Sequence, residues 1–230
     1  MKTPILRRLR RKASSLLNRF RPDPDLFLQK VPGVIHVGAN EGQERDAYAK
    51  HGLQVIWIEP IPEVFATLQK HLSVYSRQSA YQYLVTDQDG SEYAFHIANN
   101  GGASSSILDF KLHKDVWPDI AYEQTITLRG TTLASLLKKE AINPADYPAL
   151  VMDVQGSELL VLKGAEAILP AFRFIKTEVA DFEAYAGCCQ LGDINAFLKS
   201  RGFRELSRRR FAERPSGGSY YDIVYERRSS

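Results

Sequence analysis

Short apolar runs alternate with amphipathic stretches along most of the chain. Apolar positions spaced near 3.6 residues predict helices that separate most of these runs. This alternation is typical of an α/β fold with a doubly wound, mostly parallel sheet. The predicted strands are residues 34–38, 54–59, 81–85, 149–154 and 172–179, and the predicted helices are residues 41–51, 61–72, 131–140, 157–169 and 191–201.

Two regions depart from this alternation. Residues 203–207 and 219–226 have the composition of two strands joined by the turn at 215–218, which predicts an antiparallel hairpin at the end of the sheet. Between residues 90 and 128, two further predicted strands, 91–97 and 123–128, flank the small polar loop NNGGASSS at 99–106. We expect this insertion to cover a site at the edge of the sheet.

The turn after the first predicted strand has the composition of a ligand-binding turn. It reads Gly38, Ala39, Asn40, Glu41 and Gly42, and its two glycines let the backbone approach a ligand closely. The G-x-x-x-G spacing differs from the G-x-G-x-x-G that seats a dinucleotide pyrophosphate. It therefore favours S-adenosylmethionine, a cofactor that presents an amino-acid moiety and a sulfonium. The alternative is an α/β unit whose glycines only serve a tight turn.

An acidic residue at the end of the second predicted strand follows this turn at the spacing expected of a ribose ligand. Glu59 ends the second predicted strand, 21 residues after Gly38, close to the spacing of an acidic ribose ligand in a nucleotide-binding βαβ unit. Asp87 follows the third predicted strand, where it could contact an adenine ring or simply belong to the turn TDQDG. We predict that Glu59 binds both ribose hydroxyls of the cofactor.

A third stretch makes the pattern more specific. GANEG, WIEP, the block DVQGSELLVLKGA at 153–165 and a later strand ending in Glu178 together resemble the FkbM-type methyltransferases over residues 34–227. The resemblance implies a class I, Rossmann-like fold with a seven-stranded sheet, S-adenosylmethionine as cofactor, and O-methylation, often of a sugar or polyketide hydroxyl. The chain departs from the family pattern at His36, Val151 and Gln155, where Asp, Lys and Glu are usual.

The carboxyl ends of parallel strands meet at one edge of the sheet, so Gly38, Asp153 and Glu178 are expected to converge there. Asp153 and then Glu178 are the candidates for a general base or acceptor anchor, with Asp153 also beside the cofactor. Alternatively Asp153, Gln155 and Glu178 could hold Mg²⁺ or Ca²⁺. The structural alternatives are a helix N-cap for Asp153 and a salt-bridged strand end for Glu178.

The acceptor side is predicted from the insertion. Ser104, Ser105 and Ser106, with Gln155, are the candidate acceptor ligands, and His113 or Trp117 could face a sugar ring. The alternative is a surface loop without a ligand. The five histidines lack paired ligand spacing, and His36 is expected to be a core residue.

Charge is distributed unevenly along the chain. Residues 1–22 carry eight basic side chains and no acidic one, so the remaining residues carry a net charge of −5 against the +3 of the whole. We expect residues 1–24 to form a basic amphipathic arm, which either lies on an anionic membrane surface or packs on the domain. Residues 25–230 would form the catalytic domain. Its acidic balance argues against nucleic-acid binding.

The composition predicts a cytoplasmic protein. If the basic arm binds lipid, the protein would be cytoplasmic and peripheral at the membrane. The two cysteines are adjacent, which predicts neither a disulfide framework nor a zinc site, and no apolar run is long enough to span a bilayer. Three functions remain open: an S-adenosylmethionine-dependent O-methyltransferase, a nicotinamide-dependent oxidoreductase, and a noncatalytic cofactor-binding protein recruited to membranes. The first fits the motifs best.

Overall fold

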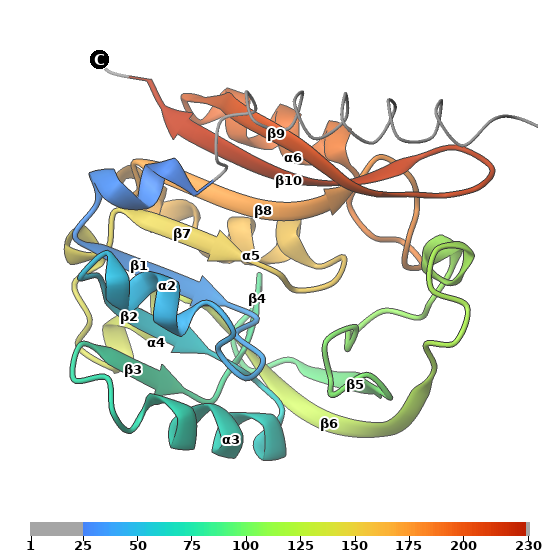
Figure 1. Cartoon of the computed structure of the whole chain (residues 1–230), viewed down its shortest axis with the longest axis horizontal. Coiled ribbons are helices and arrows are strands. Elements are labelled where there is room, and N and C mark those ends of the chain that lie inside the picture. Colours follow the sequence, from blue (N-terminus) through green and yellow to red (C-terminus); the bar gives the residue numbers. More distant parts are fainter. Residues whose placement is uncertain (1–24, 229–230) are drawn as a thin grey trace, which may run out of the picture.

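The computed structural model describes residues 25–228, so the predicted basic arm lies outside the described residues. A seven-stranded sheet forms the centre, in the order β3-β2-β1-β7-β8-β10-β9 (Figure 1). Strands β3, β2, β1, β7 and β8 are parallel, and β10 and β9 form the predicted antiparallel C-terminal hairpin. The strands are β1 Gly33–Val37, β2 Gln54–Ile58, β3 Gln78–Tyr81, β7 Ala149–Met152, β8 Phe174–Ala180, β9 Phe203–Glu213 and β10 Ser219–Arg227.

The prediction of one strand at 81–85 is wrong. The chain leaves the main sheet at the end of β3 and then forms β4, which pairs with β6 in a separate three-stranded sheet of order β4-β6-β5. The sequence reads as one run because the apolar residues of both strands are almost contiguous. The small sheet consists of β4 Leu84–Thr86, β5 Glu92–Ala98 and β6 Tyr122–Thr132, with the 3-10 helix η2 Leu112–Asp115 in the connection between β5 and β6.

Helices cover both faces of the main sheet, as a doubly wound sheet requires. α2 Arg45–Lys50 and α3 Pro62–Leu72 lie on the near face in Figure 1, and α5 and α6 lie behind it. The predicted helix at 41–51 is shorter because the turn after β1 continues to Glu44. The other helical elements are η1 Leu26–Lys30, α4 Leu133–Lys139, η3 Pro144–Asp146, α5 Glu158–Gly164, η4 Glu166–Ala171 and α6 Leu191–Ser200.

Alternate residues of the central strands supply two separate cores. Ile35 and Val37 of β1 face the α4, α5 and α6 side, whereas Val34 packs with Trp57 against η1, α2 and α3. These side chains are buried, so the central strands are apolar on both faces, as expected for a parallel sheet between two helical layers. The cores fix the register of β1 and thereby the position of the turn that follows it.

The small sheet is held against the main body by a close backbone contact. A Cβ atom at Gly164 of α5 would lie 2.1 Å from the carbonyl oxygen of Thr86 in β4, so this helix can pack against β4 only with glycine there. The segment from β5 to β6 lies on the side toward which β1, β2 and β7 point (Figure 1). Among the described residues, no helix is long and apolar enough to cross a membrane.

Candidate active site

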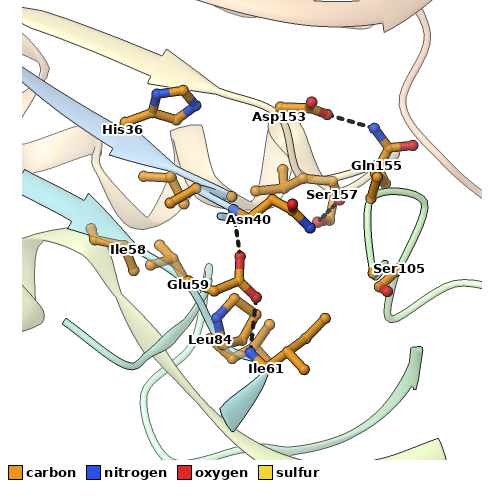
Figure 2. A pocket seen from close by; sticks show the side chains of 18 of the residues that line it. His36, Asn40, Ile58, Glu59, Ile61, Leu84, Ser105, Asp153, Gln155 and Ser157 are labelled. Atoms are coloured by element: carbon orange, nitrogen blue, oxygen red, sulfur yellow. Dashed lines mark hydrogen bonds between the residues drawn. The ribbon is translucent and has the colours of Figure 1, made fainter. Parts of the chain in front are cut away.

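A cavity of about 310 Å³ lies at the carboxyl ends of β1, β2 and β7, between these strand ends and the small sheet. Figure 2 shows its side chains converging from both walls. The volume is at the lower end of the range for small-molecule sites. Its lining includes predicted residues Gly38, Ala39, Asn40, Glu59, Ser105, Asp153 and Gln155, and also His36, Gln43, Glu44, Ile61, Tyr83, Leu84, Val85, Phe95 and Ser157.

The turn after β1 is shaped by backbone conformations that few residues adopt. Gly38 has φ +80°, and a Cβ atom there would lie 1.9 Å from the carbonyl oxygen of Asp153. The N–H groups of Gly38 and Ala39 both donate to the carbonyl oxygen of Ile58 at 3.0 Å. The turn is therefore clamped between the ends of β7 and β2, and only glycine fits at its first position.

Glu59 is buried in this wall and is held by backbone donors. Its Oε2 accepts from the N–H of Asn40 at 2.8 Å, and its Oε1 accepts from the N–H of Ile61 at 2.9 Å (Figure 2). Burial raises the pKa of Glu59 to about 7, and these two hydrogen bonds oppose that rise. Each carboxylate oxygen keeps a second lone pair, so the group can accept two more hydrogen bonds from hydroxyls in the cavity.

Beyond Glu59, the lining of the cavity is largely apolar. Ile61, Leu84, Val85 and Phe95 line it, with the ring of Tyr83. These residues come from the start of α3 and from the small sheet, so the wall exists only once the second sheet has formed. The lining of the cavity does not include Asp87, which lies in the turn beyond β4, so its contact with adenine stays a prediction.

Asp153 follows β7 at the other end of the cavity. Its carboxylate lies largely out of water, and this burial raises its pKa to about 7; a hydrogen bond from Gln155 opposes the rise, and the charges of Glu158, Glu44 and Asp222 add to it. Its backbone N–H donates to the carbonyl oxygen of Val37 at 3.0 Å. A carboxylate with a pKa near neutrality is a stronger base than an ordinary aspartate.

Gln155 joins Asp153 to two distant parts of the chain. Its Nε2 donates to Asp153 Oδ1 at 2.5 Å, and its Oε1 accepts from the hydroxyl of Tyr185 at 2.5 Å. Its backbone carbonyl accepts from Ser106 Oγ at 2.8 Å. Tyr185, in the loop after β8, was not predicted, because nothing in the sequence around it distinguishes it from a core tyrosine.

Glu178 lies apart from this cavity. It is half-buried in β8 and faces a second, much smaller cavity that it shares with Asp153, Glu158 and Tyr185. Burial raises its pKa well above the usual value, and the carboxylate of Asp153 adds to the rise. The strand continues to Ala180, so Glu178 lies beside Asp222 of β10 and not at the strand end.

The three predicted serines have mainly internal partners. Ser104 Oγ accepts from Asn100 Nδ2 at 3.0 Å, Ser105 Oγ accepts from the N–H of Ala98 at 3.0 Å, and Ser106 bonds to Gln155. Ser105 lines the main cavity, whereas Ser104 and Ser106 do not. The loop is therefore ordered by its own serines.

A side-chain contact joins this loop to the turn after β1. Asn40 Nδ2 donates to the carbonyl oxygen of Gly101 at 2.9 Å. Glu41 and Gly42 belong to the turn but do not line the cavity; a Cβ atom at Gly42 would lie 2.7 Å from Leu68, which gives this glycine a packing role. The loop at 99–106 is thus fastened to both strand-end turns, at Asn40 and at Gln155.

The two histidines nearest the site have structural surroundings. His36 is buried, its Nδ1 lies 3.1 Å from the hydroxyl of Tyr48, and burial lowers its pKa to about 3. His113 is buried in an aromatic cluster with Trp117 and Tyr220, and burial lowers its pKa to about 4. Neither His113 nor Trp117 lines the main cavity, so the prediction that one of them faces a sugar ring gains no support.

The described residues contain no group of three or more His, Cys, Asp or Glu side chains arranged to hold a metal ion. Asp153 Oδ1 accepts a direct hydrogen bond from the side-chain amide of Gln155. Cys188 and Cys189 are free thiols, and burial raises the pKa of both.

Comparison with known proteins assigns a family to this arrangement. The family model described as "Methyltransferase FkbM domain" matches residues 36–205. This segment begins in β1 and ends in β9, so it includes every residue that lines the main cavity. A search of the curated proteins found no match.

Solved structures resemble the whole fold at low sequence identity. An uncharacterized protein from Listeria monocytogenes serotype 4b has a TM-score of 0.50 at 11% identity, covering 88% of this chain and 66% of that one. TrmK from M. capricolum, solved with the cofactor product S-adenosyl-homocysteine, has a TM-score of 0.50 at 7% identity over 88% of this chain and 66% of that one. This chain therefore spans slightly less than two thirds of either structure, and the likeness concerns the fold.

Proposed function

Because the chain belongs to the FkbM methyltransferase family, we propose that it transfers a methyl group from S-adenosylmethionine to a hydroxyl oxygen of a sugar or glycan. The observation that carries this proposal is the buried Glu59 carboxylate. Both its oxygens are fixed by backbone donors and can still accept hydrogen bonds from the cavity. A vicinal pair of ribose hydroxyls matches that geometry.

The two ends of the cavity support the same cofactor. The apolar end beyond Glu59, with Leu84, Val85 and Phe95, fits a flat base such as adenine. The polar end near Asn40 and Asp153 fits the amino-acid moiety and the sulfonium. When bound, S-adenosylmethionine supplies an electrophilic methyl group, and the protein has to bring an acceptor oxygen into line with it.

The residues at the polar end would handle the proton of the acceptor. A sugar hydroxyl is a weak acid, so it becomes a useful nucleophile only if its proton leaves as the new bond forms. Asp153 lines the cavity with a pKa raised to about 7, and we assign it the role of general base. Glu178 is assigned a supporting role, because it shares a small cavity with Asp153 behind the main one.

The cofactor is tested first by calorimetric titration with S-adenosylmethionine, S-adenosylhomocysteine and NADH. We expect the two adenosyl ligands to bind and NADH not to bind. Glu59→Ala should weaken adenosyl-ligand binding more than tenfold, because losing a charged hydrogen-bond partner costs roughly 1.5–3 kcal/mol.

Glu41→Ala is the matched control, because this carboxylate lies on the same turn but outside the cavity lining. Equal loss of affinity in both variants would remove Glu59 from the ribose role. Binding of NADH alone would instead favour an oxidoreductase, and binding of none of the three would favour a noncatalytic protein.

The acceptor is tested next with free, nucleotide-linked and lipid-linked glycans, by measuring release of S-adenosylhomocysteine. Asp153→Asn should keep the wild-type affinity for S-adenosylhomocysteine, which lacks the sulfonium charge, while lowering the turnover number at least a hundredfold, because general-base catalysis contributes at least this much. Wild-type turnover in this variant would contradict the assigned base. Vesicles with anionic lipids, added to the full chain, test the membrane role of residues 1–24.

A further inference from the structure

We propose that Gln155 is a positioning residue that determines which oxygen of Asp153 receives the proton of the acceptor. The inference rests on the proposed function, because it concerns the base of that reaction. Gln155 touches Asp153 directly through its amide nitrogen at 2.5 Å (Figure 2). Its role is therefore to orient and tune the carboxylate.

The hydrogen bonds allow one orientation of the Gln155 amide. A carboxylate only accepts hydrogen bonds, so the amide NH₂ must face Asp153 and the amide oxygen must face Tyr185. Burial raises the pKa of Tyr185 far above its usual value, so its hydroxyl remains a donor. Tyr185 thus prevents the amide from turning over.

The backbone of Gln155 is fixed as firmly as its side chain. It adopts the left-handed region with φ +52°, and its carbonyl oxygen accepts from the buried Ser106. The next residue, Gly156, has φ +100°, and a Cβ atom there would lie 3.0 Å from Cys188. Gln155 is therefore held by Ser106 of the insertion, by Tyr185 of the loop after β8 and by the conformation of its own turn.

This arrangement makes the two oxygens of Asp153 unequal. Oδ1 accepts an N–H from Gln155, which lowers its basicity, so a proton taken from an acceptor goes preferentially to Oδ2. The acceptor's O–H bond then breaks as the oxygen bonds to the methyl carbon, and the methyl carbon's bond to sulfur breaks. The proton ends on Oδ2, and the electron pair of the broken carbon–sulfur bond stays on sulfur.

Gln155 also opposes the charges around Asp153. Carboxylates face this residue from four elements: Glu44 before α2, Glu158 of α5, Glu178 of β8 and Asp222 of β10. The charges of Glu158, Glu44 and Asp222 add to the rise in the pKa of Asp153 that burial causes, whereas the hydrogen bond from Gln155 lowers this pKa. A carboxyl group in place of the amide would instead share a proton with Asp153, as closely spaced carboxyl pairs do.

The direct test is a ¹³C NMR titration of protein labelled at the aspartate side-chain carboxyl, with the Asp153 resonance assigned from Asp153→Asn. We expect Asp153 to titrate near pH 7 in the wild type. Gln155→Ala should move the midpoint up by about one pH unit, and Gln155→Glu should split it into two steps, the later one above the wild-type value. Tyr185→Phe should move it upward by less, because the amide stays but is free to turn.

Gln43→Ala is the matched control, because it removes an amide from the cavity rim that bonds to Asn40 and not to Asp153. It should leave the Asp153 midpoint unchanged. Equal midpoints in the wild type, Gln155→Ala and Gln155→Glu would overturn the inference. Glu178 carries no label in this experiment, so Glu178→Gln shows which part of the Asp153 titration curve comes from its interaction with this neighbouring carboxyl.

The ratio of the affinities for S-adenosylmethionine and S-adenosylhomocysteine gives a second readout. The ligands differ by the positive methyl sulfonium, so effects of Glu59 on the ribose largely cancel in the ratio. In the wild type we expect this ratio to rise several-fold between pH 6 and pH 8, because Asp153 ionises beside the sulfonium over this range. In Gln155→Ala the same rise should be displaced to higher pH.

The two readouts separate the two ideas. Binding of both ligands with a pH-independent ratio would overturn the inference and leave the cofactor assignment intact. Failure of both ligands to bind would defeat the proposed function, and with it the inference.

Discussion

The two ends of the cavity are built differently. Around Glu59 the contacts come from backbone N–H groups of the turns after β1 and β2, whereas around Asp153 they come from the side chain of Gln155, which the distant Tyr185 holds in place. A backbone-built end depends on chain conformation and tolerates many side-chain changes except at its glycine. A side-chain-built end keeps its shape only while each partner is present, so it is where small substitutions should alter reactivity.

The largest effect is expected where the two ends touch. Gly38→Ala should lower the free energy of unfolding by about 3 kcal/mol or more, because the new Cβ would overlap the Asp153 carbonyl at a positive φ. Urea denaturation of the purified variant measures this. Gly52→Ala is the control: Gly52 has φ +68° but no atom within 4 Å of the added Cβ, so we expect a loss of about 1 kcal/mol. Equal losses would mean that the close approach is relieved by a small shift.

This contrast explains which parts of the site could be predicted from the sequence. Gly38, Asn40 and Glu59 lie within one βαβ unit, where the spacing along the chain determines the spacing in space. Asp153 follows its strand directly, and its position beside β1 comes from the order of the sheet. Most strands and helices and the terminal hairpin were predicted for the same local reason, with boundaries differing by a few residues.

The remainder depends on contacts between distant segments. The hydroxyl of Tyr185 meets Gln155 across 30 residues and that of Ser106 meets it across 49, and no periodicity encodes either contact. The division of residues 78–86 between two sheets was missed because hydrophobic runs do not show where a chain changes sheets. Asp87 was predicted either to contact adenine or to belong to the turn TDQDG, and it lies in the turn directly after β4.

The next largest effect concerns the pH dependence of stability. Burial raises the pKa of Asp153 from 3.8 to about 7, so the folded state binds a proton that the unfolded state has released. This contribution to stability is complete below about pH 4 and is lost as the pH rises through 7. Asp153→Asn should therefore flatten the decline and raise the free energy of unfolding at pH 8 by roughly 1–3 kcal/mol.

Urea denaturation of both proteins at pH 5, 6, 7 and 8 checks this expectation. Asp89→Asn provides a control of opposite sign, because hydrogen bonds from Thr132 N–H and Ser135 lower the pKa of Asp89. Its substitution should destabilise the protein at pH 8. A decline of the same steepness in Asp153→Asn and the wild type would assign the pH dependence to Glu59 and Glu178.

A smaller effect is expected at the contact between the insertion and the side-chain-built end. Ser106→Ala removes the buried hydrogen bond to the Gln155 carbonyl and should cost about 1 kcal/mol of stability. Hydrogen exchange of the amides around Gln155 should accelerate in the same variant. Ser104→Ala is the matched control, because its hydroxyl bonds only within the loop to Asn100 and should leave exchange around Gln155 unchanged.

The smallest effect tests how far the backbone-built end is independent of side chains. Asn40→Gly keeps the backbone N–H that binds Glu59 and the positive φ of 45°, but removes the side-chain contact with Gly101. We expect a threefold loss of cofactor affinity, corresponding to roughly 0.5–1 kcal/mol for one exposed hydrogen bond. Calorimetry with S-adenosylhomocysteine measures it. A loss as large as that in Glu59→Ala would show that the Asn40 side chain carries the binding.

The small sheet supplies both most of the apolar wall of the cavity and the loop at 99–106, which lines the cavity through Gly102, Ala103 and Ser105, so we expect the two to respond to ligands together. A cofactor that packs against Leu84 and Phe95 would also steady residues 99–106. An acceptor would then meet a complete binding surface only on the cofactor-loaded protein. This predicts a compulsory order of addition in steady-state kinetics, with S-adenosylhomocysteine competing against S-adenosylmethionine and inhibiting noncompetitively against the acceptor.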